Sequence, residues 1–250
     1  MKLLIILLCL LSERYLIHKI SQQRFNWFTA YCNKIAHYFP QSNLLTNSTF
    51  FLLAVILPPL VITWIILMIA DHLLFGFITF LLNLIIFYYC LGPDNPFYPI
   101  REEAEADNSE SAARTYFAQV NGQLFAVIFW FVITGALGVL CYRLISLCRD
   151  QEKTTNLAIL ITDILDWIPA RITVLLYLLV GNFQKGVHFY SQKFLSSPTN
   201  NNYFLSEGGL LAARTTENEP VELTYAQNLV EHAVIVYLVF LALFTLIALL

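Results

Sequence analysis

The chain has few charged side chains, and this scarcity excludes most soluble folds. Only 12% of its 250 residues are Asp, Glu, Lys or Arg, whereas 58% are hydrophobic. Soluble domains carry roughly 25% charged residues, so this chain has too little polar surface to cover a soluble core. We therefore expect an integral membrane protein. The net charge of −3 is mixed in sign and forms no basic stripe, so we expect no nucleic-acid partner.

Several chemical signatures are also missing. The 5 cysteines form no Cys-x-x-Cys pair and the 5 histidines are scattered singly, so we predict reduced, buried thiols and no metal site. The sequence contains no GxSxG, HExxH, Walker-type or dinucleotide-binding fingerprint. These absences argue against the common soluble enzyme chemistries. They indicate no particular cofactor.

Long apolar runs predict an all-α, polytopic fold with four to five transmembrane helices. A bilayer crossing takes about 20 apolar residues. Four runs meet this requirement, namely Phe50–Ala70, Leu73–Leu91, Leu124–Leu144 and His232–Leu250. The segment Leu157–Gly181 is a fifth span if its charges are sheltered, and a re-entrant or interfacial helix if they are not. The distribution of lysine and arginine favours a cytoplasmic N-terminal region, while the side of the C-terminus stays open.

The remaining segments complete the expected organisation. Residues 1–48 predict a retained membrane-associated helix followed by an amphipathic interfacial helix, with Phe28 and Cys32 on its apolar face. The Ser, Asn, Gly and Pro residues of 197–220 predict a mobile loop. The further boundaries are 49–91 for a transmembrane hairpin, 92–123 for an acidic loop, 124–181 for a membrane core, 182–231 for a polar loop region and 232–250 for a C-terminal transmembrane helix.

One apolar segment holds charged residues at its centre. Asp163, Asp166 and Arg171 lie there together with Trp167 and Pro169. A charge at bilayer depth costs roughly 2.5 to 3.5 kcal/mol, so such residues persist mainly where they face a partner or a water-filled cavity. The proline removes one helix N–H, which leaves a carbonyl without its usual donor. We therefore predict ligand-binding roles for the three charged residues and structural roles for Trp167 and Pro169.

Three interpretations of this segment are open. The charges can form a buried ionic cluster that fixes helix pairing, with Arg171 stacked over Trp167 four residues earlier. Alternatively, Arg171 can recognise an anionic small molecule, because arginine binds phosphate or carboxylate in a two-pronged geometry. In the third interpretation, Asp163 or Asp166 acts as a catalytic base or metal ligand, which needs further groups that the sequence does not supply.

The span Leu124–Leu144 has two features of its own. Gly135 and Gly138 are small, and we expect them to let another helix approach closely. Arg143 ends the span and is a further ligand-binding candidate. Its side chain either extends to the membrane surface or joins the polar site of Asp163 and Asp166.

Three motifs, taken in order, resemble those of the AmpE family. They are Tyr89-Cys90-Leu91-Gly92-Pro93, the Phe-Ala-x-x-Phe-Trp-Phe run from Phe125 through Gly135 and Gly138 to Tyr142-Arg143, and Asp163-Ile-Leu-Asp-Trp-Ile-Pro-Ala-Arg171. The resemblance covers nearly the whole chain. It implies a bacterial inner-membrane protein that is associated with the regulation of inducible β-lactamase.

AmpE proteins in turn resemble the CobD/CbiB membrane synthases, which form an amide bond in cobalamin assembly. The shared core is Asp-x-x-x-x-x-Pro-Ala-Arg, matched here by Asp163, Pro169, Ala170 and Arg171. This chain departs from the synthases at positions where they carry acidic or amide groups. The residues at those positions are Ala118, Gln119, Gly122, Ser146 and Arg149.

From the residues and the resemblance together, we predict a multi-pass inner-membrane sensor or regulatory protein. The alternative is a membrane-bound synthase related to CobD/CbiB, and a small-solute transporter is a third possibility with no inverted repeat to support it. The expected partners are the lipid bilayer, an anionic small-molecule ligand, and either a second copy of the chain or a regulatory protein.

Overall fold

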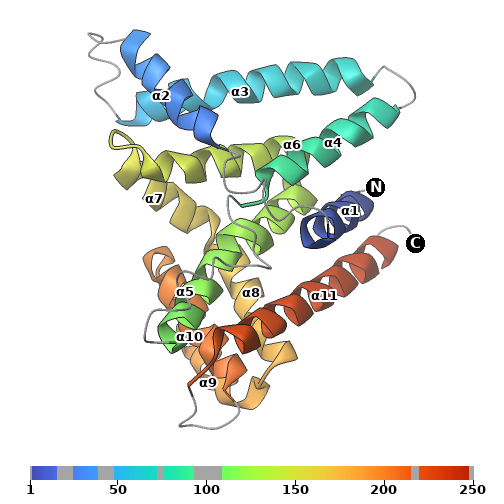
Figure 1. The fold of residues 1–250 in the computed structure, drawn as a ribbon, viewed down its shortest axis with the longest axis vertical. Helices are drawn as coiled ribbons and strands as arrows, with labels where there is room; N and C mark the ends of the chain where they lie inside the picture. The colour runs from blue at the N-terminus through green and yellow to red at the C-terminus, as the bar shows by residue number, and fades with distance from the viewer. Residues whose placement is uncertain are drawn as a thin grey trace. The chain divides into compact units, whose positions relative to one another are not determined.

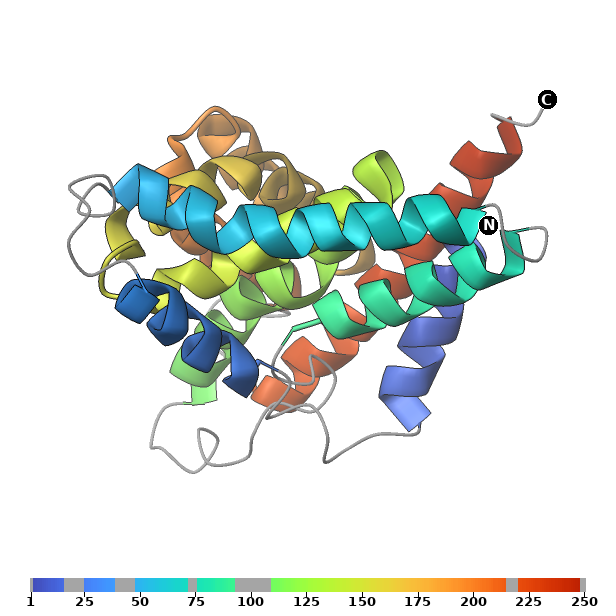
Figure 2. The same ribbon diagram turned by 90° about the horizontal axis from the view of Figure 1, so that it is seen from above.

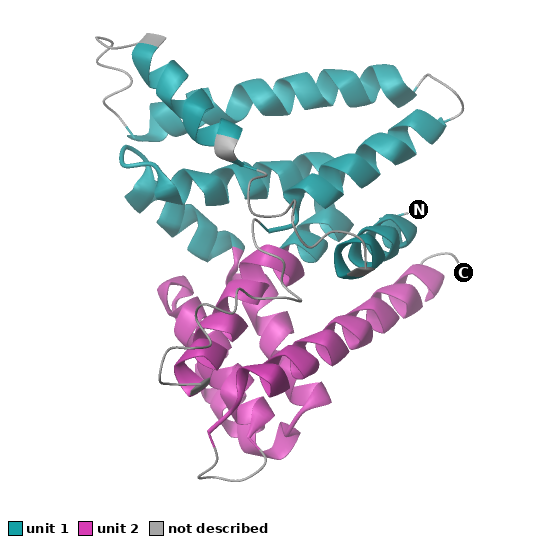
Figure 3. Ribbon diagram, viewed as in Figure 1, with its two compact units in different colours: residues 1–93, 127–165 teal, residues 94–126, 166–250 magenta. Residues whose placement is uncertain are grey.

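The computed structural model describes residues 2–15, 25–38, 48–71, 76–92, 109–214 and 220–247. Over these ranges the chain is helical and contains no strand. The predicted all-α membrane fold is therefore confirmed. Figure 1 shows the helices in chain order, and Figure 3 divides them into two compact units. We describe each unit separately.

The first unit comprises residues 1–93 and 127–165. Within it α3 contacts α2, α4 and α7, and α1 contacts α4, as the two views in Figures 1 and 2 show. Its core includes Phe28 and Cys32 from α2, which pack with Phe51 and Val55. The elements are α1 (Lys2–Tyr15), α2 (Asn26–Tyr38), α3 (Ser48–Asp71), α4 (Phe77–Cys90), α6 (Ala126–Leu147, except its first residue), the 3-10 turn η5 (Cys148–Asp150) and α7 (Thr155–Leu165).

The second unit comprises residues 94–126 and 166–250. In it α10 packs against both α5 and α8, and α11 packs against α8 and α5. Phe117, Phe125 and Tyr177 are fully buried and lie ring against ring at its centre. The elements are α5 (Ser109–Val120), the π-helical turn η4 (Asn121–Phe125), α8 (Trp167–Val180), α9 (Phe183–Lys193), the 3-10 turn η6 (Pro198–Asn200), α10 (Asn201–Ala213) and α11 (Leu223–Ile247).

Three of the described helical stretches are long and apolar enough to cross a membrane, namely Ser48–Asp71, Glu110–Asp150 and Leu223–Ile247. The bounds of two predicted spans differ from the structure. Where we predicted a span over Leu73–Leu91, the described helix α4 has 14 residues, which at 1.5 Å per residue falls short of a bilayer core of about 30 Å. The last span is α11, which begins at Leu223, nine residues before the predicted start at His232.

The segment 157–181 is two helices rather than one. The helix breaks at Asp166, which stands between α7 and α8, and not at Pro169 as the proline alone suggests. Pro169 is the third residue of α8, where backbone N–H groups have no intrahelical acceptor, so a proline costs little. The carbonyl of Asp166 accepts from the N–H of Ala170. The break coincides with the boundary between the two units.

Part of the polar region after this segment is also helical, which corrects the loop we predicted over 197–220 at residues 201–213. Residues 201–213 form α10, and Gly208 and Gly209 lie in its interior. A Cβ on Gly208 would lie 2.5 Å from a methyl group of Val174 on α8. A Cβ on Gly209 would lie 2.4 Å from the ring of Phe117 on α5. Close helix packing therefore explains the two glycines that resembled loop residues.

Gly135 and Gly138 do not have the role that we predicted. Gly135 has a φ of 76° and interrupts the regular geometry of α6. A Cβ there would meet nothing within 4 Å, so no described helix approaches it closely. A Cβ on Gly138 would collide with Thr134 of the same helix. Gly135 thus permits a kink in α6, because a positive φ favours glycine. Gly138 leaves room for the side chain of Thr134, one turn earlier in the same helix.

Some predictions concern residues outside the described part of the chain. These are residues 93–108 of the predicted acidic loop, residues 72–75 within the predicted transmembrane hairpin, residues 215–219 of the predicted mobile loop, and the end of the C-terminal helix after Ile247. They stay predictions. The described end of the acidic region is not a loop, since residues 109–120 form α5.

Candidate functional site

Arg171 is the most completely bonded of the predicted site residues. It lies in the second turn of α8 and is only 3% exposed. Its Nε donates to the carbonyl of Phe194 at 3.0 Å. Its Nη1 donates to the carbonyl of Trp167 at 3.0 Å and to Oδ1 of Asn201. Its Nη2 donates to the carbonyl of Ser196 at 2.9 Å and to the Oγ of the same residue at 3.0 Å. A guanidinium has five N–H groups. All five are used by neutral oxygen atoms of the protein.

Two aromatic rings lie against the same guanidinium. Its central carbon lies 4.4 Å from the ring centroid of Trp167 and 4.9 Å from that of Phe204. The predicted stacking on Trp167 is therefore present. The quadrupole of each ring attracts a cation placed over its face, so the rings compensate in part for a positive charge among neutral acceptors.

The acceptors of Arg171 come from a part of the chain that the sequence did not indicate. Ser196 lies in the connection after α9, and Asn201 is the first residue of α10 and is buried. The indole of Trp167 also donates to the carbonyl of Ser196 at 2.9 Å. A buried arginine demands several oxygen acceptors. The need for acceptors could be inferred from the sequence, but the sequence does not tell which oxygen atoms of the chain accept from Arg171.

Tyr190 supports the same group of residues from α9. Its hydroxyl donates to the backbone carbonyl of Arg171 at 3.4 Å, and its ring contacts those of Phe194 and Phe204. Burial raises the pKa of Tyr190, an effect that the nearby Arg171 charge partly offsets. The phenol is therefore neutral at physiological pH and can act as a hydrogen-bond donor.

Asp163 and Asp166 lie on opposite sides of the helix break. Asp163 is half-buried in the last turns of α7, within electrostatic range of Arg149. Asp166 is the residue before α8 and gives no side-chain cap to that helix. The partners of Arg171 given above include neither carboxylate, so a direct ion pair between Arg171 and these acids is not part of this site.

A second buried polar contact connects α8 to the π-helical turn. The hydroxyl of Thr173 donates to Oδ1 of Asn121 at 2.9 Å, and both residues are buried. Turns of π-helix occur often at functional sites. This contact lies beside Ala118, Gln119 and Gly122, the positions of α5 and η4 where the sequence departs from the synthases.

Arg143 lies in the first unit, near the C-terminal end of α6, and is 3% exposed. Its Nε donates to the carbonyl of Cys90 at 2.7 Å. Cys90 is the last residue of α4, so Arg143 satisfies a carbonyl that has no intrahelical donor, at the negative end of the helix dipole. The guanidinium carbon lies 6.0 Å from the ring centroid of Phe25. Arg143 is therefore buried between helices and does not extend to the surface.

The described residues contain no group of three or more His, Cys, Asp or Glu side chains that could hold a metal ion. In the described part of the chain, Glu110, Arg114, Glu207 and Arg214 form a cluster of ion pairs. Arg114 lies 2.6 Å from Glu207 and 3.2 Å from Glu110, which lies 2.8 Å from Arg214. These ion pairs connect α5 to α10 and its C-terminal end. They are partly exposed, so they contribute little stability.

Comparison with known proteins finds distant relatives among the CobD proteins. The chain is 32% identical over 94 residues to "Cobalamin biosynthesis protein CobD" of Chromobacterium violaceum, covering 34% of this chain and 30% of that protein. It is 31% identical over 99 residues to the protein of the same name from Stutzerimonas stutzeri, covering 35% and 32%. The matched region is thus about a third of each relative. No protein-family model and no solved structure matches the chain.

The apolar helices and the CobD relatives together identify a multi-pass inner-membrane protein. The similarity supports the CobD part of the resemblance seen in the sequence. The AmpE part, and the regulatory role that it implies, stay predictions.

Proposed function

We propose that this protein is a regulatory binding protein of the inner membrane, built on a helical scaffold shared with the CobD proteins, without synthase activity. The observation that carries this proposal is the environment of Arg171. Each of its N–H groups donates to a protein oxygen, and the rings of Trp167 and Phe204 lie against the guanidinium. Arg171 therefore holds the chain after α9 against α8.

A catalytic or phosphate-binding role needs a different environment for this arginine. Two-pronged binding of a phosphate uses two N–H groups that point into a site. Here a ligand would have to break at least two of the existing bonds to Ser196, Asn201, Phe194 or Trp167. A hydrogen bond to a charged group contributes about 1.5 to 3 kcal/mol, so this exchange gives little net gain. The structural interpretation of the Asp-Pro-Arg segment is favoured over the two functional ones.

The neighbouring positions support the same proposal. Ala118 and Gly122 carry no ionisable group at places where the resemblance gives the synthases acidic residues, whereas Gln119 keeps an amide. Asp163 and Asp166 are the carboxylates left near the motif, and a metal-assisted or phosphate-directed reaction needs more ligands than these. Regulation of inducible β-lactamase is the specific role that the AmpE resemblance implies.

One observation favours the second candidate, a membrane-bound enzyme related to the CobD synthases. The two curated relatives are both cobalamin biosynthesis proteins, and the match covers about a third of this chain. If the chain retains synthase activity, the catalytic residues lie at positions other than those where its sequence differs from the synthases.

The regulatory proposal is tested by β-lactamase induction in a strain that lacks this gene. We expect deletion to change the induction of β-lactamase by a β-lactam, and the wild-type gene to restore it. Variants Asp163→Asn and Asp166→Asn, compared at equal membrane abundance by immunoblot, then show whether the helix break takes part. Unchanged induction after deletion would remove the regulatory assignment.

A further inference from the structure

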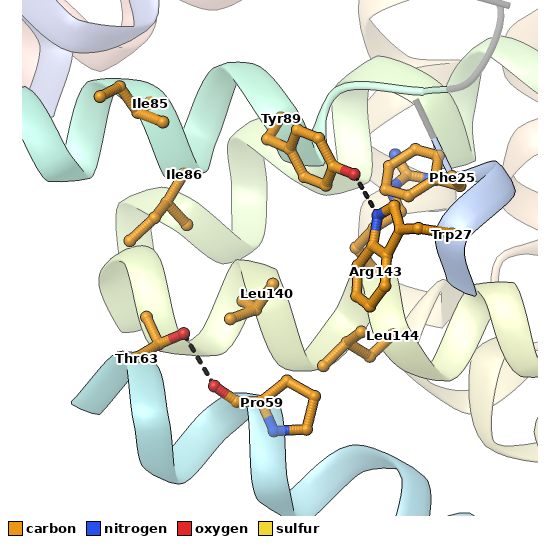
Figure 4. A pocket seen from close by; sticks show the side chains of 10 residues that line it. All are labelled: Phe25, Trp27, Pro59, Thr63, Ile85, Ile86, Tyr89, Leu140, Arg143 and Leu144. Atoms are coloured by element: carbon orange, nitrogen blue, oxygen red, sulfur yellow. Dashed lines mark hydrogen bonds between the residues drawn. The ribbon is translucent and has the colours of Figure 1, made fainter. Parts of the chain in front are cut away.

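The first unit contains a cavity of 270 Å³ that neither the Asp-Pro-Arg segment nor the CobD similarity explains. It lies among α3, α4, α6 and the beginning of α2 (Figure 4). Its walls are mainly apolar, and Arg143 is the one ionisable cation among them. The lining residues are Phe25, Trp27, Pro59, Thr63, Ile85, Ile86, Tyr89, Leu140, Arg143 and Leu144.

The cavity has two chemically different ends. Figure 4 shows Arg143, Phe25, Trp27 and Tyr89 gathered at one end, where the Trp27 indole donates to the Tyr89 hydroxyl. The aliphatic side chains of α4 line the other end. One end of the cavity is thus lined by the Arg143 cation and by aromatic rings that carry polar atoms. The other end is lined by hydrocarbon side chains.

These ends match the two levels of a membrane. Arg143 and Tyr89 lie near the C-terminal ends of α6 and α4, and tryptophan and tyrosine are enriched where bilayer and water meet. Leu140 and Ile86 lie about one turn earlier in the same helices, which places them deeper in the apolar layer. A ligand that fits both ends has a polar head at the interface and a hydrocarbon chain directed inward.

Two of the residues that line the cavity are exposed. Ile85 is 58% exposed and Trp27 is 44% exposed, so both border an opening. The exposed side chains of α3, including Ile62 and Ile66, are apolar as well. A molecule that reaches this opening arrives through an apolar surface, which favours a membrane-dissolved ligand over a water-soluble one.

We propose that this cavity binds a single-chain anionic amphiphile, with its phosphate or carboxylate head against Arg143 and its chain over Ile86 and Leu140. A buried cation at a membrane interface favours an anionic head over an uncharged one. Pockets for drug-sized ligands have volumes of about 300 to 1,000 Å³. The cavity is slightly smaller than this range, which fits one chain segment and excludes a nucleotide or a large ring system.

The test is equilibrium binding of radiolabelled dodecyl phosphate to the full-length protein in an uncharged detergent. Dodecanol, which has the same chain without the charge, is the ligand control. Ile86→Trp fills the chain end of the cavity without touching Arg143. Ile66→Trp makes the same change on an exposed face of α3 and is the control variant. Arg143→Gln removes the charge.

The expected result is saturable binding of dodecyl phosphate, weakened about tenfold or more by Ile86→Trp and by Arg143→Gln. Ile66→Trp binds as the wild type does, and dodecanol competes poorly. Competition by dodecanoate against dodecyl phosphate tells whether a carboxylate or a phosphate head is preferred. If Arg143→Gln does not fold because the carbonyl of Cys90 loses its donor, the Ile86→Trp comparison decides. Equal binding by Ile86→Trp and Ile66→Trp, or equal competition by dodecanol, overturns the proposal.

Discussion

The guanidinium of Arg171 stacks on the indole of Trp167, with 4.4 Å between its central carbon and the ring centroid. The two residues are one helical turn apart at the beginning of α8. Both also donate to the carbonyl of Ser196. The stacked pair therefore fixes the connection between α9 and α10 to α8, and its loss is expected to loosen that connection.

Replacing Arg171 by Ala should destabilise the protein severely. The change removes the Arg171 donors to the Phe194 carbonyl and to Oδ1 of Asn201, and one of the two donors to the Ser196 carbonyl, so we expect a loss of about 3 kcal/mol or more. Arg171→Lys, with three donors and no planar fork, should lie between Ala and wild type. Melting temperature in detergent and membrane abundance measure the effect. Lys193→Ala, at an exposed position of α9, is the control, and an equal effect there would contradict the structural role of Arg171.

Trp167→Phe should cost less than the loss of Arg171. The variant keeps an aromatic face under the guanidinium but loses the indole bond to Ser196, so we expect a loss of about 1 kcal/mol. Trp64→Phe is the matched control, since Trp64 is 50% exposed on α3. The melting temperature of Trp167→Phe should be clearly lower than that of Trp64→Phe. If both variants melt together with the wild type, the indole bond to Ser196 contributes nothing.

The two glycines of α10 should tolerate no added methyl group. Gly208→Ala and Gly209→Ala bring a Cβ within 2.5 Å of Val174 and 2.4 Å of Phe117. Overpacking of this kind costs typically about 1 to 3 kcal/mol. Asn202→Ala, at an exposed position of the same helix, should have little effect on the melting temperature. Wild-type stability of both glycine variants would show that α10 does not pack closely between α5 and α8.

Cys32 should resist thiol reagents in the folded protein. It is 1% exposed, and burial raises its pKa to about 11. Because only the thiolate reacts, labelling should stay slow at pH 8 and increase only when the pH approaches that value or the protein unfolds. A variant in which Cys32 is the single cysteine, labelled with a maleimide before and after denaturation, gives the comparison. Rapid labelling of the folded protein at pH 8 would show that α2 is not packed on α3 as described.

The parts of the fold that the sequence predicts are those governed by local rules. The span over Phe50–Ala70 follows from apolar length alone, and the structure has α3 there. The stacking of Arg171 on Trp167 follows from helical spacing. By contrast, the helix breaks at Asp166 and not at Pro169, because a proline in the first turn of a helix has no intrahelical bond to lose.

Tertiary packing explains what the sequence did not predict. The composition of α10 is typical of a loop, yet Gly208 and Gly209 permit close approach to α8 and α5, and that burial outweighs low helix propensity. The acceptors Ser196 and Asn201 have no sequence pattern that connects them to Arg171 across more than twenty residues. The kink at Gly135 depends on a backbone conformation that sequence periodicity does not report.

We propose that the chain shares a scaffold with the CobD proteins but acts in regulation and not in cobalamin synthesis. Growth of a strain that lacks its CobD synthase and requires cobalamin, complemented with this gene, tests the claim most directly. A CobD gene on the same vector is the positive control, and an immunoblot of membranes confirms that this protein is present. We predict no growth on cobinamide-free medium without added cobalamin. Growth at ordinary expression would contradict the account and establish the synthase as the function.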